Sequence, residues 1–438
     1  MKKLLFLIII AIVCIAAKAQ SIDERLGSAM NSSDHFGLYD AYYGAPRDSI
    51  SPFMEIFSRC MIGNRFNRPD ISIPAFNRLI KRHSGDLGPE LRLQCAVMYS
   101  MDLSRVGRNK EACKVLSSAL ASAGNKVDRA DLVAYKNMAE QYRALAKFSP
   151  YSISWDGERG VIPFDTVPAG KPESRQYLMQ LTEAQVNGRQ ARITFDTGAG
   201  ANVITDSLAK IYGLELLDAH VSATGVETSH GHYAIAKELK MGNITVRDVP
   251  FYVIDISSHN EKADQYLNAL GLVVGSELML QLKDVVIDFT TKEIQVPNTT
   301  ALPSNERPNM CFSSGMNLLA TAKVNGQLIQ IVLDSGNAGY GNLNKAFFEA
   351  NRDFLTSSCQ TDTVNMAGVG GVWSILCYKL QDAGLDIGGS TIKIPYISVQ
   401  SKQQNEGYMA ENNLGLKSMM LFRKVRFNLV DMAFSAER

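Results

Sequence analysis

The sequence lacks the motifs that mark several common protein classes. Its 45 Lys and Arg nearly balance its 44 Asp and Glu, and no basic segment is interleaved with aromatic residues, so nucleic acid is not an expected partner. It contains no C-x-x-C pair, no G-x-S-x-G elbow and no Walker-type loop, which argues against a zinc cluster, a serine hydrolase and a nucleotide site respectively. His230 and His232 form an H-x-H pair with no evident third ligand. We therefore expect neither a cofactor nor a metal.

Long hydrophobic runs are also absent, except at the N-terminus. Met1-Lys2-Lys3 precedes an apolar run from Leu4 to Ala17, and Ala17-Lys18-Ala19 has the small-x-small form of a cleavage site. This pattern is typical of a secretory signal, so we expect the mature chain to begin at Gln20. A retained anchor is the less favoured alternative, because the run is short for a bilayer span. The sequence predicts an exported protein, periplasmic or secreted, with no membrane span after signal cleavage.

Two short motifs of the same form organise the second part of the chain. Ile193–Ala199 reads ITFDTGA and Ile331–Asn337 reads IVLDSGN. In each motif a short apolar run of β character leads to an Asp, then to a hydroxyl residue and a Gly at which the backbone can turn sharply. A single D-[ST]-G triplet is a weak signal, since an Asp in a turn usually caps its own backbone. Two copies of the motif in one chain are stronger evidence than one that these Asp residues do more than cap a turn.

The two motifs belong to a longer repeat. Val186-Asn187-Gly188 stands before the first Asp and Val324-Asn325-Gly326 before the second, and in both copies the Val lies ten residues before the Asp. Asn-Gly between apolar runs predicts a tight hairpin. Val274-Gly275 follows the first motif, and Leu414-Gly415 follows the second. The spacing indicates a duplicated domain, with two β lobes that each contribute one carboxylate.

With these motifs, residues from about 175 to 437 resemble aspartic peptidases of the retropepsin and pepsin type, with both lobes fused in one polypeptide. The resemblance implies an all-β, two-lobed acid-protease fold, a peptide or protein substrate, and Asp196 with Asp334 as the catalytic pair. It also implies four supporting residues. Thr197 and Ser335 would hydrogen-bond across to the opposite loop, and the two loops would approach each other at Gly198 and Gly336.

Two neighbouring carboxyl groups would be able to hydrolyse a peptide bond without a metal ion. Like charges at short range raise one pKa, so the pair holds one proton between them, and neither Asp has a fixed role. The ionised member would activate a water molecule while the protonated member polarises the scissile carbonyl. The second motif departs from the family at Asn337 and in the Gly-rich stretch that follows. A catalytically inactive peptide-binding protein on the same fold is therefore the alternative.

The family covers its substrate cleft with a β-hairpin flap. Ala223–Tyr233 occupies that place in the first lobe, and Ala367–Trp373 occupies it in the second. The resemblance therefore indicates a substrate-binding role for four residues in these two stretches, namely Gly225, Tyr233, Gly370 and Trp373. An aromatic side chain at a hairpin more often packs against its own domain, which is the competing interpretation of Tyr233 and Trp373.

Residues 20–150 have a different character. Apolar residues recur at helical spacing in four stretches: 73–83, 90–106, 109–123 and 128–147. The second and third stretches resemble one tetratricopeptide-type (TPR-like) helical pair with Gly107 at the turn, and a small helical bundle is an equally good interpretation. Such a domain would dock a protein partner or cover the cleft. A third hypothesis places the protein's function in this domain, as an assembly scaffold.

The expected organisation is thus a multidomain protein with an N-terminal all-α domain and an all-β protease region. Cys359 and Cys377 bracket a turn-rich stretch, so a disulfide there would tie the base of a hairpin. The expected segments are a signal peptide (1–19), the helical domain (20–150), a Pro- and Gly-rich linker (151–174), the first lobe (175–298), an inter-lobe linker (299–310) and the second lobe (311–438).

Overall fold

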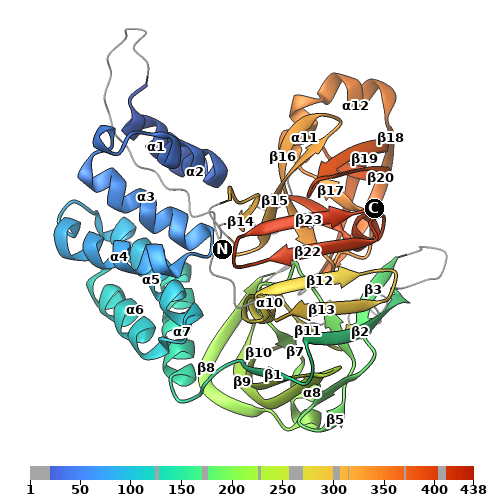
Figure 1. The fold of residues 1–438 in the computed structure, drawn as a ribbon, viewed down its shortest axis with the longest axis horizontal. Coiled ribbons are helices and arrows are strands. Elements are labelled where there is room, and N and C mark those ends of the chain that lie inside the picture. Colours follow the sequence, from blue (N-terminus) through green and yellow to red (C-terminus); the bar gives the residue numbers. More distant parts are fainter. Residues whose placement is uncertain are drawn as a thin grey trace. The chain divides into compact units, whose positions relative to one another are not determined.

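The computed structural model describes residues 20–123, 128–169, 176–224, 228–255, 270–298, 306–313, 315–368, 371–402 and 411–438. The expected signal peptide lies outside these ranges. The described residues form two compact units, a helical unit and a β unit (Figure 1). Among the described residues, the helical unit contains those of 20–146 and 311–313, and the β unit contains those of 147–310 and 315–438. A helical region followed by a β protease fold confirms the predicted fold class.

Seven α-helices and one 3₁₀-helix make up the described part of the helical unit. They are α1 (Ile22–Asn31), α2 (His35–Gly44), the 3₁₀-helix η1 (Arg47–Ser49), α3 (Pro52–Arg65), α4 (Pro69–His83), α5 (Pro89–Arg105), α6 (Asn109–Ala123) and α7 (Arg129–Leu145). Helices α4 to α7 fall on the four periodic stretches. Proline at the first helical position starts α3, α4 and α5, where a missing N–H costs nothing. Gly107 has φ +76° between α5 and α6, a conformation that favours glycine.

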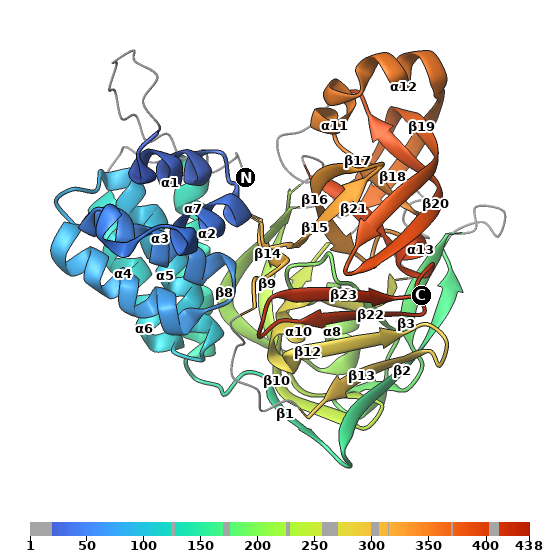
Figure 2. The ribbon, with the colours of Figure 1, turned by 45° about the horizontal axis from the view of Figure 1, so that its top comes forward.

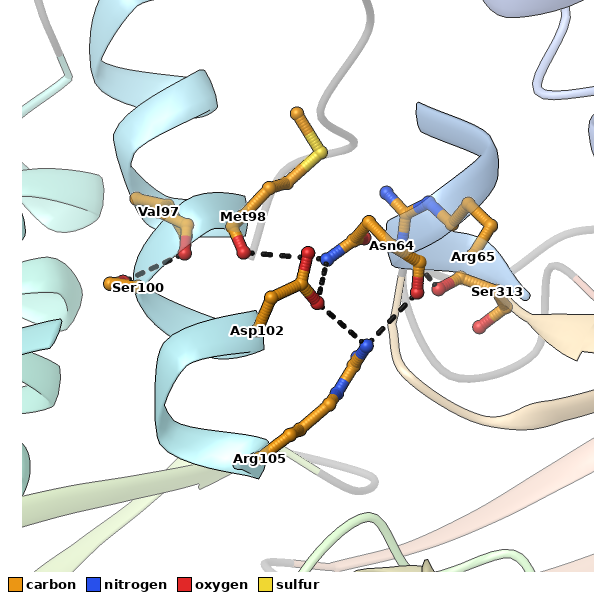
Figure 3. A network of polar contacts seen from close by, with 8 residues as sticks. All are labelled: Asn64, Arg65, Val97, Met98, Ser100, Asp102, Arg105 and Ser313. Carbon is orange, nitrogen blue, oxygen red and sulfur yellow. Dashed lines mark hydrogen bonds and ion pairs between the residues drawn. The ribbon is translucent and has the colours of Figure 1, made fainter. Parts of the chain in front are cut away.

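A buried polar network ties α3 to α5 (Figure 3). The Asp102 carboxylate is fully buried. Its Oδ1 accepts hydrogen bonds from Asn64 Nδ2 and from Arg105 Nη1, both at 2.9 Å. The same Arg105 nitrogen donates to the backbone carbonyl of Asn64 at 2.9 Å. A buried charge is tolerated when it is paired and hydrogen-bonded in this way, so the network fixes the packing of the two helices.

The helical unit also contains a short segment from far along the chain. Residues 311–313 open the stretch that we expected to be the second lobe. Arg65 Nη1 donates to the backbone carbonyl of Ser313 at 2.8 Å, as Figure 3 shows. The Arg105 guanidinium lies 4.6 Å from the centroid of the Phe312 ring, a cation–π distance. The helical unit is therefore built from two separate parts of the sequence.

The first lobe of the β unit is made mainly of short strands. Its elements are β1 (Ser152–Trp155), β2 (Arg159–Pro168), β3 (Tyr177–Leu181), β4 (Ala184–Val186), β5 (Arg189–Gln190), β6 (Ile193–Phe195), β7 (Val203–Ile204), α8 (Asp206–Tyr212), β8 (Glu215–Thr224), β9 (Thr228–Met241), β10 (Ile244–Ile254), β11 (Leu272–Val274), α10 (Ser276–Leu282), β12 (Asp284–Asp288) and β13 (Glu293–Pro297). The expected linker, 151–174, includes β1 and β2, and β2 pairs with β3 and β13. Much of that stretch is therefore sheet.

The second lobe repeats this plan. Strand β14 (Met310–Phe312) precedes it and includes two residues of the helical unit. The elements of the lobe itself are β15 (Leu318–Val324), β16 (Gln327–Asp334), β17 (Gly341–Leu343), α11 (Lys345–Ala350), α12 (Arg352–Ser358), β18 (Gln360–Gly368), β19 (Gly371–Ile387), β20 (Ser390–Gln400), β21 (Asn412–Gly415), α13 (Leu416–Met419), β22 (Lys424–Asn428) and β23 (Ala433–Glu437). Cys359 and Cys377 are free thiols, so the expected disulfide is not formed. Cys377 pairs instead across the hairpin with Asp362.

The predicted Asn-Gly hairpins are present in both lobes. In the first, Val186 pairs with Arg189, and in the second Val324 pairs with Gln327. Both residues of each turn have positive φ, at +49° and +76° in the first lobe and +48° and +84° in the second. These values are typical of the type I′ turn, which suits the twist of a two-residue hairpin. Local sequence alone is enough to set this geometry.

The two lobes share one sheet. Strand β12 pairs antiparallel with β22, and the two strands lie side by side in Figures 1 and 2. Arg426 on β22 forms two hydrogen bonds with the buried Asp284 carboxylate on β12, at 2.9 and 2.6 Å. This bidentate, charge-assisted pair adds to the ladder between the lobes. In the described part of the chain, no helix is long and apolar enough to cross a membrane.

Candidate active site

Each Asp motif emerges from a strand that pairs in parallel with a later strand of its own lobe. In the first lobe β6 pairs with β11, and in the second β16 pairs with β21. The glycines at the ends of β11 and β21 pack against the Asp loops. A Cβ on Gly275 would lie 2.4 Å from the Ala199 carbonyl oxygen, and one on Gly415 would lie 2.3 Å from that of Gly339. The two later apolar-Gly elements therefore support the two loops at distances that exclude a side chain.

Four buried hydrogen bonds join the two loops, and we call this set the loop interlock. Thr197 Oγ1 donates to the Leu333 carbonyl at 2.8 Å and accepts from Ser335 N at 2.9 Å. Ser335 Oγ donates to the Phe195 carbonyl and accepts from Thr197 N, both at 2.9 Å. The two hydroxyl residues are at most 1% exposed. The contacts that the resemblance implies for Thr197 and Ser335 are thus present in the structure.

The glycines of the two motifs let the loops come into contact. A Cβ on Gly198 would lie 2.3 Å from Asp334 Oδ1, and one on Gly336 would lie 2.2 Å from Asp196 Oδ2. Real Cβ atoms do not approach other atoms so closely. Each carboxylate therefore lies against the glycine of the opposite loop, and the structure brings Asp196 and Asp334 together.

Backbone N–H groups hold the Asp196 carboxylate. Its Oδ1 accepts from Gly198 at 2.8 Å, from Ala199 at 3.2 Å and, across the lobes, from Gly336 at 3.1 Å. Such donors stabilise a carboxylate and lower its pKa. Burial and the neighbouring Asp334 outweigh them, and together they raise the pKa of Asp196 to about 7.

Side-chain and backbone donors hold the Asp334 carboxylate. Its Oδ1 accepts from the backbone N–H of Asn337 at 3.0 Å, and its Oδ2 accepts from Asn413 Nδ2 at 2.6 Å. Burial raises the pKa of Asp334 as well, against the lowering effect of these donors. Two carboxyls so close together do not readily ionise together, so the pair retains a proton below neutral pH.

Sequence reasoning missed Asn413 and treated Asn337 as a departure from the family pattern. In the structure the two side chains meet, because Asn337 Nδ2 donates to Asn413 Oδ1 at 2.8 Å. Asn413 stands directly before Leu414-Gly415, so its place beside a recognised element was the one signal available. Its contact with Asp334 joins residues 79 apart in the chain.

A second polar cluster holds Gly275, the residue that packs against the first-lobe Asp loop. Asn202 is fully buried, and its Oδ1 accepts from the backbone N–H of Gly275 at 3.0 Å. Its Nδ2 donates to the Tyr151 hydroxyl at 3.0 Å. Tyr151 in turn hydrogen-bonds the Glu277 carboxyl, and burial raises the pKa of Glu277 to about 7. Sequence reasoning did not select these residues, since none of them belongs to a motif.

The predicted flap stretches are hairpins, β8–β9 in the first lobe and β18–β19 in the second. Gly225 and Gly370 lie outside the described residues. Tyr233 is 2% exposed and packs edge to face against Tyr252 at 5.5 Å. Its ring therefore packs within the lobe, in line with the competing interpretation, and a contact between Tyr233 and substrate stays a prediction. Trp373 lies on β19 opposite Met366.

One comparison with known proteins agrees with the motifs. The aspartyl protease family model matches residues 182–274. No curated protein matches the chain. Among solved structures, a retropepsin-like aspartic protease from Rickettsia conorii aligns with 34% of this chain and 96% of its own, at 14% identity and a TM-score of 0.21. The family match in the first lobe, together with the duplicated Asp motifs, confirms the resemblance of this chain to aspartic peptidases of the retropepsin type.

Proposed function

We propose that this protein is an exported aspartic endopeptidase that hydrolyses peptide bonds with a water molecule activated between Asp196 and Asp334. The observation that carries the proposal is the loop interlock, which joins the two Asp loops and brings their carboxylates together. An Asp that only caps its own turn does not require hydrogen bonds between its loop and a second loop. Export is proposed from the N-terminal signal pattern alone.

The pair performs the reaction with one proton. The ionised carboxylate takes a proton from water as its oxygen attacks the scissile carbonyl carbon, while the protonated carboxyl donates its proton to the carbonyl oxygen. The resulting tetrahedral diol collapses when a proton reaches the amide nitrogen and the C–N bond breaks. The pair returns to its singly protonated state. Because Asp196 has a pKa of about 7, activity is expected to decline as the pH rises above neutrality.

The test is cleavage of a mixed peptide library at pH values from about 3 to 8, a range that spans both ionisations. Wild type is compared with the isosteric variants Asp196→Asn and Asp334→Asn. Asp206→Asn is the matched control, because Asp206 lies in the first lobe but is exposed and pairs with Lys210. We expect either active-site variant to abolish cleavage, and a statine-type transition-state mimic to block the wild type.

Two other results would redirect the proposal. Activity that survives Asp334→Asn would make the second lobe structural and refute the shared mechanism. A wild type that binds the mimic but cleaves nothing would support the peptide-binding alternative. A protein partner for the helical unit is a separate proposal, and we base it on the TPR-like pattern of α5 and α6.

A further inference from the structure

The hydrogen-bond donors around the two carboxylates differ between the lobes. Asp196 accepts only backbone N–H groups among its described donors, and these converge on Oδ1. Asp334 accepts on both oxygens, and one of its donors is the Asn413 side chain, at 2.6 Å from Oδ2. The duplicated motifs therefore place the two carboxyls in unequal surroundings.

The orientation of the Asn413 amide follows from a chain of hydrogen bonds. The chain starts at the backbone N–H of Gly339, which donates to Asn337 Oδ1 at 3.0 Å. Since a backbone N–H is always a donor, Asn337 must present its Nδ2 to the next residue. Asn337 Nδ2 donates to Asn413 Oδ1 at 2.8 Å. Asn413 must then direct its own Nδ2 at Asp334, so the oxygen that it meets acts as an acceptor.

We propose that Asn413, oriented by Asn337, fixes Asp334 as the ionised member of the pair and Asp196 as the member that carries the shared proton. A donor fixed on Oδ2 favours an ionised Asp334, because a charge-assisted hydrogen bond is stronger than one to a neutral carboxyl. Asp196 has its backbone donors on Oδ1, which leaves Oδ2 to carry the proton. Asp334 then accepts the proton from water, and Asp196 donates to the scissile carbonyl.

Asn413 and Asn337 are positioning residues in this scheme, which rests on the proposed function for its kinetic consequences. Their effect on protonation does not depend on turnover. It is measured directly by carboxyl ¹³C NMR of protein labelled at the Asp side chains, with Asp196→Asn and Asp334→Asn used to assign the two resonances. In wild type we expect Asp334 to ionise at the lower pH and Asp196 near neutrality.

The decisive variant is Asn413→Ala. Loss of one charge-assisted donor is expected to raise the pKa of Asp334 by about one unit. The acid limb of the kcat/KM profile should move to higher pH by the same amount, because the ionised Asp334 is needed at a pH where it is now protonated. Asn337→Ala leaves the Asn413 amide in place without its orienting partner. It should shift both readouts in the same direction by less, and it serves if Asn413→Ala does not fold.

Asn412→Ala is the matched control. Asn412 is the neighbouring residue on β21, and its amide bonds the backbone of Gln330 and Asn344, at 2.8 and 2.9 Å. Its loss should lower stability and leave both the NMR titration and the pH profile unchanged. A shift equal to that of Asn413→Ala would show a general effect of a damaged strand and overturn the proposal.

The two readouts separate this inference from the proposed function. If wild type cleaves peptides but Asn413→Ala moves neither the Asp334 resonance nor the acid limb, the inference is wrong and the function stands. The inference is also wrong if Asp196 is the first to ionise in wild type. If wild type cleaves nothing but the resonances behave as expected, the proton assignment stands and the proposed function fails.

Discussion

The loop interlock gives the sharpest prediction about stability and catalysis together. Ser335→Ala removes the hydroxyl that accepts from Thr197 N and donates to the Phe195 carbonyl, each at 2.9 Å. Ser335 is fully buried, so water does not replace the lost partner. With about 1 kcal/mol for each hydrogen bond and a further penalty for each stranded buried group, we expect a loss of roughly 2 to 4 kcal/mol in the free energy of unfolding.

The assay is urea denaturation followed by tryptophan fluorescence. The two Trp residues of the chain, Trp155 and Trp373, both belong to the β unit, so the signal reports the unit that contains the interlock. The two Asp loops should also shift relative to each other. A displacement of about 1 Å in an active site lowers the rate by roughly 100-fold, and we expect a fall in kcat of that order.

Two further variants make this prediction refutable. Ser335→Thr keeps the hydroxyl and matches the residue at position 197, so it should recover most of the stability and activity. Ser357→Ala removes an exposed hydroxyl that donates to Asp353 O at 2.7 Å, and it should cost less than about 0.5 kcal/mol. The reasoning fails if Ser335→Ala resembles Ser357→Ala, or if Ser335→Thr is as damaging as Ser335→Ala.

Three other predictions concern single residues. Gly198→Ala places a Cβ 2.3 Å from the facing carboxylate oxygen and should abolish peptide cleavage, whereas Gly200→Ala, where a Cβ meets nothing within 4 Å, should not. Glu277 has a pKa raised from 4.5 to about 7, so the folded β unit binds its proton more tightly than the unfolded chain. The free energy of unfolding of the β unit should therefore fall by up to about 3 kcal/mol as the pH rises from 4.5 to 7. Urea midpoints across that range should show a shallower fall for Glu277→Gln, and an unchanged slope would contradict the assignment. Asp102→Ala deprives the largely buried Arg105 side chain of its carboxylate partner and should cost the helical unit about 3 to 5 kcal/mol, measured by circular dichroism at helical wavelengths. A loss below about 1 kcal/mol would mean that the network contributes little.

The family resemblance could be read from the sequence because its signals are local and repeated. The Asp motifs and the Asn-Gly turns each depend on a few consecutive residues whose backbone preferences decide the result. Helices α4 to α7 were also predictable, since apolar spacing acts within one segment. The surroundings of Tyr233 were not predictable for the same reason. Tyr233 sits near a hairpin in the sequence, but its burial depends on Tyr252 across the sheet.

The sequence by itself determined that two β lobes each deliver one Asp through a turn, and that a helical region precedes them. Only the tertiary structure decided how the Asp residues are surrounded. The reciprocal hydrogen bonds between Thr197 and Ser335 join residues 138 apart in the chain. The hydrogen bond from the Asn413 amide to Asp334 joins residues 79 apart. It also decided that residues 311–313 belong to the helical unit. Secondary structure follows from neighbours along the chain, whereas hydrogen-bond partners and pKa values follow from neighbours in space, which no local pattern specifies.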